Sequence, residues 1–121
     1  MSSNAIIWHY PRCSKSRKTL QILEEEGVEV TIRRYLEDPP DAQTLAETID
    51  RLDIAPHQLV RTKESLYGDL DIEEETMTDE QWVELMVNHP KLIQRPVVIC
   101  DTGAVVGRPP ERVHELLSET K

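Results

Sequence analysis

The fold prediction starts from one stretch, Ile6-Ile7-Trp8-His9-Tyr10-Pro11-Arg12-Cys13-Ser14-Lys15-Ser16-Arg17. An apolar run ends here, a proline interrupts it, and a helical pattern begins directly after Cys13. The thiol of Cys13 is therefore expected at a helix start, where free backbone N–H groups and the positive end of the helix dipole favour an anion. Such a position lowers the pKa of a thiol and makes it a nucleophile. A free cysteine is more often an inert apolar residue, but the strand–proline–cysteine–helix order favours a reactive thiol.

The charge around Cys13 has the opposite sign to that of the whole chain. The protein has a net charge of −9, yet residues 12–18 contain four cations and no acid. The overall acidity argues against a general nucleic-acid-binding protein, which needs an extended basic surface. The local excess of positive charge still suits a small anion. The four cations are Arg12, Lys15, Arg17 and Lys18.

Length and cysteine content suggest the class of protein. A chain of 121 residues is expected to form a single domain over residues 1–121 with its own core. It has no apolar run long enough to span a membrane, and its first residues lack the charged and apolar regions of a signal peptide. Two cysteines in such a chain indicate a reducing compartment, where a cysteine is more often catalytic than structural. We therefore expect a cytoplasmic protein with no membrane or nucleic-acid partner.

The first third of the chain predicts a strand, a helix and a second strand. Residues 5–9 form the first strand, and the helix after Cys13 is expected to end at Gly27. In residues 28–33, Val28, Val30 and Ile32 alternate with polar side chains, as in a half-buried strand. A strand–helix–strand unit of this length favours parallel strands.

The middle of the chain predicts helices. Pro40 is expected to open one helix and Pro56 a short second one. Thr78-x-x-Gln81 is the pattern of a capping box at the start of a third helix. Residues 64–84 contain nine acids and no base. They lack a ligand pattern for a metal, so a solvated surface is the better interpretation, and no metal site is expected.

The last third predicts a β-hairpin and a final helix. Val97–Cys100 and Ala104–Val106 are short apolar runs separated by a turn at 101–103, and they are expected to pair antiparallel. Together the elements predict an α/β protein of the thioredoxin-like fold. It would have a four-stranded mixed sheet and a helical insertion at about residues 40–90.

Three arginines stand at the ends of predicted elements: Arg61, Arg95 and Arg108. Loops held by a rigid scaffold are where sites are usually built, and arginine gives bidentate hydrogen bonds to oxyanions. Three arginines around a thiolate would bind a phosphate-like or arsenate-like anion. Each alone is more often a surface charge, and sequence spacing does not show that the three converge.

Several separated motifs, in order from about residue 5 to about residue 117, resemble the glutaredoxin-dependent arsenate reductase (ArsC) family. The similarity is greatest to its YfgD-like branch. The motifs are His9-Tyr10-Pro11-Arg12-Cys13-Ser14-Lys15-Ser16-Arg17, Tyr35-Leu36-Glu37-Asp38-Pro39-Pro40, Arg61-Thr62-Lys63-Glu64, Arg95-Pro96 and Gly107-Arg108-Pro109-Pro110-Glu111.

The resemblance implies a role for each candidate site residue. It implies that Cys13 is the nucleophile and that Arg61, Arg95 and Arg108 bind the oxyanion. His9 matches a histidine that precedes the cysteine loop and would tune the thiol, although a packed strand-end histidine is an equal alternative. Pro96 matches the cis-proline that faces the active site in thioredoxin-like proteins. The neighbouring cations Lys15 and Arg17 are further candidates for tuning the thiol.

The resemblance also implies a reaction. Cys13 would attack arsenate, glutathione would attack the adduct as co-substrate, and glutaredoxin would remove the resulting mixed disulfide, with no tightly bound cofactor. Ser16 stands three residues after Cys13, which excludes a Cys-x-x-Cys disulfide and agrees with an external thiol. Cys100 lies in an apolar strand and is expected to be buried and inert. One departure concerns the substrate. Established arsenate reductases resemble Cys-Gly-Thr-Ser-Arg at this loop, whereas this chain has Ser14 and Lys15 after Cys13.

Two other functions remain open at the level of sequence. Spx-type regulators share the family's fold and bind RNA polymerase, but they typically carry the Cys-x-x-Cys pair that Ser16 interrupts. For such a function, the acidic segment 64–84 would be a partner surface. The other alternative is a thiol reductase acting on glutathione mixed disulfides, which has no need of three arginines.

Overall fold

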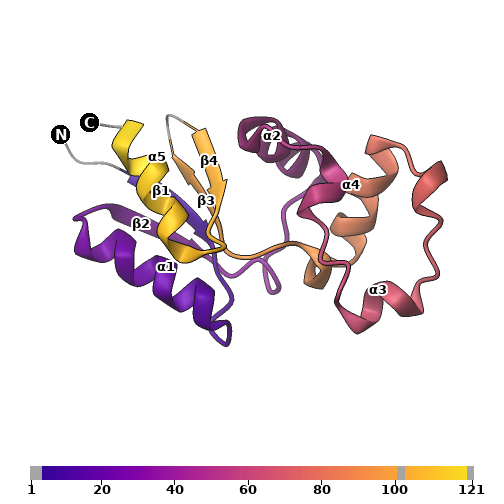
Figure 1. The fold of residues 1–121 in the computed structure, drawn as a ribbon, viewed down its shortest axis with the longest axis horizontal. Coiled ribbons are helices and arrows are strands. Elements are labelled where there is room, and N and C mark those ends of the chain that lie inside the picture. The colour runs from indigo at the N-terminus through magenta and orange to yellow at the C-terminus, as the bar shows by residue number, and fades with distance from the viewer. Residues whose placement is uncertain (1–3, 101–102, 120–121) are drawn as a thin grey trace. The chain divides into compact units, whose positions relative to one another are not determined.

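The computed structural model describes residues 4–100 and 103–119. Contacts within the chain define two compact units, Met1–Asp38 with Arg95–Lys121 and Pro39–Gln94. One domain over residues 1–121 stays a prediction. The strands are β1 (Asn4–Trp8), β2 (Glu29–Arg33), β3 (Val97–Cys100) and β4 (Gly103–Val106); the α-helices are α1 (Ser14–Glu25), α2 (Ala42–Leu52), α3 (Ser65–Asp69), α4 (Asp79–Asn88) and α5 (Val113–Glu119) (Figure 1).

The first unit is built on a four-stranded sheet in the order β2-β1-β3-β4. Strand β1 pairs parallel to β2 and antiparallel to β3, and β3 pairs antiparallel to β4. The predicted strand–helix–strand unit, hairpin and mixed sheet are therefore confirmed. Residues 101 and 102, where the hairpin turn is expected, lie outside the described residues.

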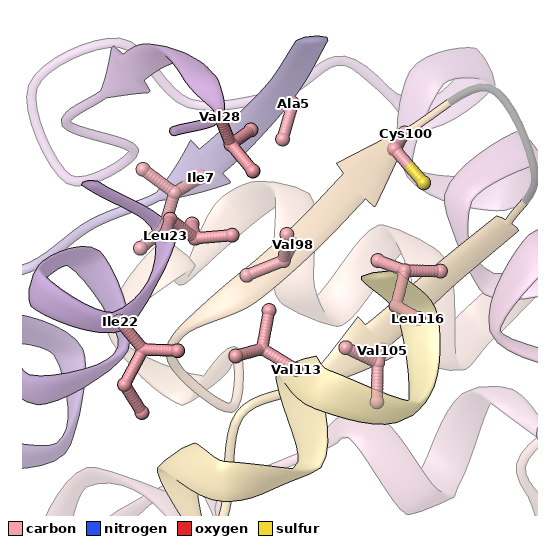
Figure 2. Close-up of a cluster of buried hydrophobic side chains, with 10 residues drawn as sticks. All are labelled: Ala5, Ile7, Ile22, Leu23, Val28, Val98, Cys100, Val105, Val113 and Leu116. Carbon is pink, nitrogen blue, oxygen red and sulfur yellow. The ribbon is translucent and has the colours of Figure 1, made fainter. Parts of the chain in front are cut away.

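Helices α1 and α5 cover one face of this sheet (Figure 1). Ile7 of β1 is paired directly with Val98 of β3. Because paired residues of neighbouring strands lie on the same face of a sheet, both side chains point towards the helices. The helices complete the core with Leu23 from α1 and Val113 from α5, all four side chains being fully buried. Figure 2 shows this cluster, which consists of Ala5, Ile7, Ile22, Leu23, Val28, Val98, Cys100, Val105, Val113 and Leu116.

Strand β2 differs from its predicted burial. Val28 and Val30 contact the core as expected, but the side chain of Ile32 is 48% exposed. Ile32 pairs with Ile7 in the register, yet β2 is an edge strand. The alternation of apolar and polar residues therefore predicted the strand correctly. It did not predict how far the helices cover the β2 edge of the sheet.

The second unit is helical, as the predicted insertion at about residues 40–90 requires. Helix α2 begins at Ala42, two residues later than expected from Pro40, because the side chain of Asp41 caps it by accepting a hydrogen bond from the Thr44 N–H at 2.8 Å. Helix α4 has the predicted capping box. The Thr78 hydroxyl accepts a hydrogen bond from the Gln81 N–H at 3.2 Å, and the Thr78 N–H donates to Gln81 Oε1 at 2.9 Å.

One glycine of the first unit holds three elements close together. The Gly107 N–H donates to the Pro96 carbonyl at 2.9 Å, which extends the β3–β4 ladder past both strand ends. A Cβ atom on Gly107 would lie 2.7 Å from Oγ1 of Thr19 and 2.9 Å from Cγ of Pro96. The Thr19 hydroxyl has little freedom to move, because it donates to the Lys15 carbonyl at 2.8 Å.

We expect Gly107→Ala to lower the free energy of unfolding by about 1–3 kcal/mol, because overpacking a buried contact costs that much. Gly68→Ala is the matched control, since no atom lies within 4 Å of its added Cβ, and alanine favours a helix by up to about 1 kcal/mol over glycine. Urea unfolding followed by circular dichroism measures both. Equal stability of the two variants would contradict the close packing at Gly107.

Candidate active site

Cys13 lies at the N-terminus of α1, as the sequence predicts. Its backbone is extended (φ −90°, ψ 121°) and forms the N-cap of the helix. The Cys13 N–H donates to the Tyr10 carbonyl at 2.9 Å, and the Cys13 carbonyl accepts from the Arg17 N–H at 3.0 Å. The tight turn after β1 thus places the thiol next to the free N–H groups of the first helical turn.

The surroundings of Cys13 lower its pKa. Burial is the largest influence and raises the pKa of this thiol, but hydrogen bonds outweigh it. These bonds come from the backbone N–H groups of Ser16 and Lys15 and from the guanidinium of Arg95, whose charge acts in the same direction. A lowered pKa increases the fraction of thiolate, which is the nucleophilic form of cysteine.

Arg95 is the charged group next to this thiol, and two tyrosines hold it. Its side chain is only 8% exposed. Its Nη1 donates to the hydroxyl of the fully buried Tyr35 at 3.3 Å, and its Cζ lies 4.6 Å from the centre of the Tyr10 ring. Its Nε is buried without a hydrogen-bond partner among the described residues. A fixed cation with an unused donor therefore lies beside the thiol.

Arg108 joins Arg95 through the extended hairpin. Beyond the Gly107–Pro96 hydrogen bond, Nη1 of Arg108 donates to the Arg95 carbonyl at 3.0 Å. The peptide bonds Arg95–Pro96 and Arg108–Pro109 are both cis, and the family resemblance predicts only the first. The structure therefore brings Arg95 and Arg108 together at one end of the sheet.

Arg61 belongs to the second unit. Its Nη1 lies 3.5 Å from Oε2 of Glu64, and Oε1 of that carboxylate lies 3.4 Å from Nζ of Lys91. A contribution of Arg61 to the anion site stays a prediction.

His9 and Ser16 support the loop from within. Nδ1 of His9 lies 2.6 Å from the Ser16 hydroxyl, which also accepts a hydrogen bond from the Tyr10 N–H at 3.1 Å. Burial lowers the pKa of His9, and the positive charges of Arg34 and Arg17 lower it further. Because His9 Nδ1 and the Ser16 hydroxyl share a hydrogen bond, His9 reaches Cys13 through Ser16, whose backbone N–H bonds the thiol.

The two cations proposed for tuning the thiol have structural contacts. Lys15 contributes its backbone N–H to Cys13, and its side chain is exposed. Nη1 of Arg17 donates to the Pro11 carbonyl at 2.8 Å and so braces the loop. A direct effect of either side chain on the thiol stays a prediction.

Cys100 lies in the core of the first unit (Figure 2). It pairs with Ala5 at the start of β1, whereas Cys13 follows the end of that strand. Three strand residues span about 10 Å, and a disulfide needs Cα atoms within about 7 Å. Cys100 is therefore no partner for Cys13 in this fold.

Three contributing residues were not singled out from sequence. Tyr10 and Tyr35 hold Arg95, and Ser16 joins His9 to the loop. Tyr35 follows β2, far from Cys13 in sequence, and a lone tyrosine before a proline break carries no signal of an arginine partner. Ser16 carried a usable signal, because a polar residue at the third helical position often serves a cap.

The fold and this constellation define the class: a thioredoxin-like protein with a thiol and an arginine paired at a helix N-terminus. The ArsC family profile matches residues 8–116. The solved structure of an arsenate reductase from Vibrio cholerae superimposes on this chain with a TM-score of 0.91 at 38% identity, over 95% of this chain and 98% of that chain. The thioredoxin-like fold is thereby confirmed, and the chain belongs to the ArsC family.

Two relatives illustrate the range of the family. The YfgD protein of Escherichia coli (strain K12) is 42% identical over 97% of this chain and 99% of its own length. An arsenate reductase of Neisseria meningitidis is 36% identical over 92% of this chain and 96% of its own length. Within the described residues of the present structure, no helix is long and apolar enough to cross a membrane, and no cluster of three metal-binding side chains occurs.

We expect the thiol pKa of Cys13 to lie below the value of about 8.5 for a free thiol. Arg95→Gln should raise it towards that value, and Tyr35→Phe should raise it less, because the Arg95 charge remains beside the thiol. Ultraviolet thiolate absorbance against pH, with Cys13→Ser subtracted, measures all three. A pKa unchanged by Tyr35→Phe would show that Tyr35 does not position Arg95.

The lowered pKa of His9 predicts a loss of stability in acid. An unfolded histidine takes up a proton below about pH 6.5, whereas folded His9 resists it, so the unfolded state binds more protons and stability falls as pH falls through this value. The free energy of unfolding should fall more between about pH 7 and pH 5.5 for wild type than for His9→Gln. Parallel curves would mean that His9 titrates normally in the fold.

Proposed function

We propose that this protein reduces arsenate to arsenite, with Cys13 as nucleophile and Arg95, Arg108 and Arg61 as the oxyanion site. Glutathione and glutaredoxin would supply the reducing equivalents. The observation that carries the proposal is the buried Arg95 guanidinium, which lowers the pKa of the Cys13 thiol and has an Nε with no hydrogen-bond partner among the described residues. The relatives named arsenate reductases support the choice of oxyanion.

The unused Nε of Arg95 favours an oxyanion as ligand. Burying an unpaired polar group costs about 1–3 kcal/mol, and a ligand oxygen would remove that cost. Arginine binds the paired oxygens of tetrahedral anions, and Arg108 lies beside Arg95. Their charges would also offset the repulsion between a thiolate and an incoming anion.

The first chemical step would join sulfur to arsenic. The Cys13 thiolate attacks As(V), an arsenate oxygen takes up protons and leaves as water, and a Cys13–S–As bond forms. The helix N-terminus stabilises the thiolate beforehand. The arginines stabilise negative charge that develops on the remaining oxygens, an effect of about 10²–10³ in rate for each donor in other enzymes.

The second step would reduce arsenic. A glutathione thiolate attacks the Cys13 sulfur, the S–As electron pair passes to arsenic, and arsenite leaves as As(III). Glutaredoxin then exchanges with the Cys13–glutathione disulfide and restores the thiol. An external thiol fits the site because Cys100 lies at the other end of β1 and the residue three positions after Cys13 is a serine, Ser16.

The test is arsenate-dependent NADPH oxidation coupled through glutaredoxin, glutathione and glutathione reductase. Cys13→Ser should abolish activity, and Arg95→Gln and Arg108→Gln should each lower kcat/KM about 10²-fold or more. Arg61→Gln tests the third arginine in the same assay. Arg112→Gln is the matched control, since Arg112 is an exposed arginine close to Arg108 in sequence with an ion pair to Glu115.

Two outcomes would redirect the proposal. Full activity in Cys13→Ser would show that Cys13 is not the nucleophile. The thiol reductase alternative would be supported if the wild-type protein did not reduce arsenate but released glutathione from a mixed disulfide, and if the arginine variants kept that activity.

A further inference from the structure

A groove lies between helices α2 and α4 of the second unit. Its volume is about 540 Å³. Most of its lining is apolar or small, including the exposed Ala42 and Ala46 of α2 and the partly buried Val83 and Val87 of α4. The complete lining is Ala42, Gln43, Ala46, Ile49, Pro56, Asp79, Glu80, Val83, Glu84 and Val87.

The spacing of these residues gives the groove the dimensions of a helix-binding site. On α2 the lining residues Ala42, Ala46 and Ile49 recur at helical spacing, and on α4 the lining runs from Asp79 to Val87. Each wall therefore follows one helix face for about two turns, or about 10 Å. Grooves of this kind receive an amphipathic helix through apolar residues at i, i+3 or i+4, and i+7. The two alanines leave room for close approach of a partner backbone.

Charge identifies the occupant. Three carboxylates line the groove, Asp79, Glu80 and Glu84, and the lining residues include no lysine or arginine. Asp79 and Glu80 stand in the first turn of α4, where acids complement the helix dipole, but Glu84 lies beyond that turn. Among the described residues, no ion pair is formed by Glu80 or Glu84. These carboxylates remain available to a cationic partner.

The charge of the whole unit reinforces this complementarity. Residues 39–94 contain 13 acidic and four basic side chains, a net charge of −9, which equals that of the entire protein. The rest of the chain contains ten of each sign. A strongly negative field steers positively charged partners and repels nucleic acid and anionic membranes.

We propose that the α2–α4 groove binds an amphipathic helix of a partner protein, with apolar residues on one face and Lys or Arg along its edges. A second copy of this chain is a poorer occupant. Its basic segment, 12–18, contains the Cys13 loop, and the apolar residues that follow, Ile22 and Leu23, are already in the core. The proposal does not depend on arsenate reduction, because the groove lies in a unit that lacks Cys13.

The test uses a labelled model peptide of leucine and lysine, patterned as an amphipathic helix, titrated with the full chain and followed by fluorescence anisotropy. The same peptide with glutamate in place of lysine is the peptide control. Asp79→Asn/Glu80→Gln/Glu84→Gln should weaken binding of the lysine peptide about fivefold or more, as expected for three partly screened charge pairs. Asp69→Asn/Glu73→Gln/Glu75→Gln changes the charge of the unit equally outside the groove and should have little effect.

Ala46→Arg provides an independent variant, because it places a long cation in the groove at an exposed helix position. It should weaken binding at least tenfold, whereas Asn88→Arg, on α4 outside the lining, should not. Circular dichroism confirms that each variant is folded. No binding by wild type, equal losses in both triple variants, or self-association of the chain that Ala46→Arg abolishes would each overturn the proposal.

Discussion

The effect of the Arg95 guanidinium on the Cys13 thiol, whose pKa it lowers, is the interaction on which the site depends. Burial alone would raise the pKa of this thiol and leave it inert, and the backbone N–H groups of Ser16 and Lys15 act together with Arg95 to reverse that effect. Arg95 is itself buried, and Tyr35 and Tyr10 hold it in place. A cation fixed by protein contacts needs no reorganisation when an anion arrives, and this is the physical basis of electrostatic catalysis.

The sheet explains how residues far apart in sequence meet at this point. Strand β1 lies between β2 and β3, so the loop after β1, the residues after β2 and the residues before β3 share one end of the sheet. The Gly107–Pro96 hydrogen bond extends the hairpin to that end and sets Arg108 against Arg95. The core under α1 and α5 fixes the strands, and the close contact at Gly107 fixes the hairpin against α1.

The sequence predicted the elements more completely than the contacts between them. Periodicity and caps located the strands, the hairpin and the Thr78 capping box, because these patterns are local. The exposure of Ile32 and the Tyr35–Arg95 contact were not predicted, since both depend on which elements pack together. Cys13 was found because its signal, a thiol after a strand and before a helix, is also local. The convergence of Arg95 and Arg108 follows from hairpin register, whereas the role of Arg61 rests on family resemblance.

The pH dependence of Cys13 alkylation by iodoacetamide, measured with and without sulfate as an unreactive oxyanion, tests whether Arg95 both lowers the thiol pKa and binds an oxyanion. The account predicts an inflection below the free-thiol value of about 8.5. It also predicts that sulfate slows alkylation in wild type but much less in Arg95→Gln, because the anion and the thiolate share that guanidinium. An inflection at the free-thiol value, with no protection by sulfate, would contradict the account.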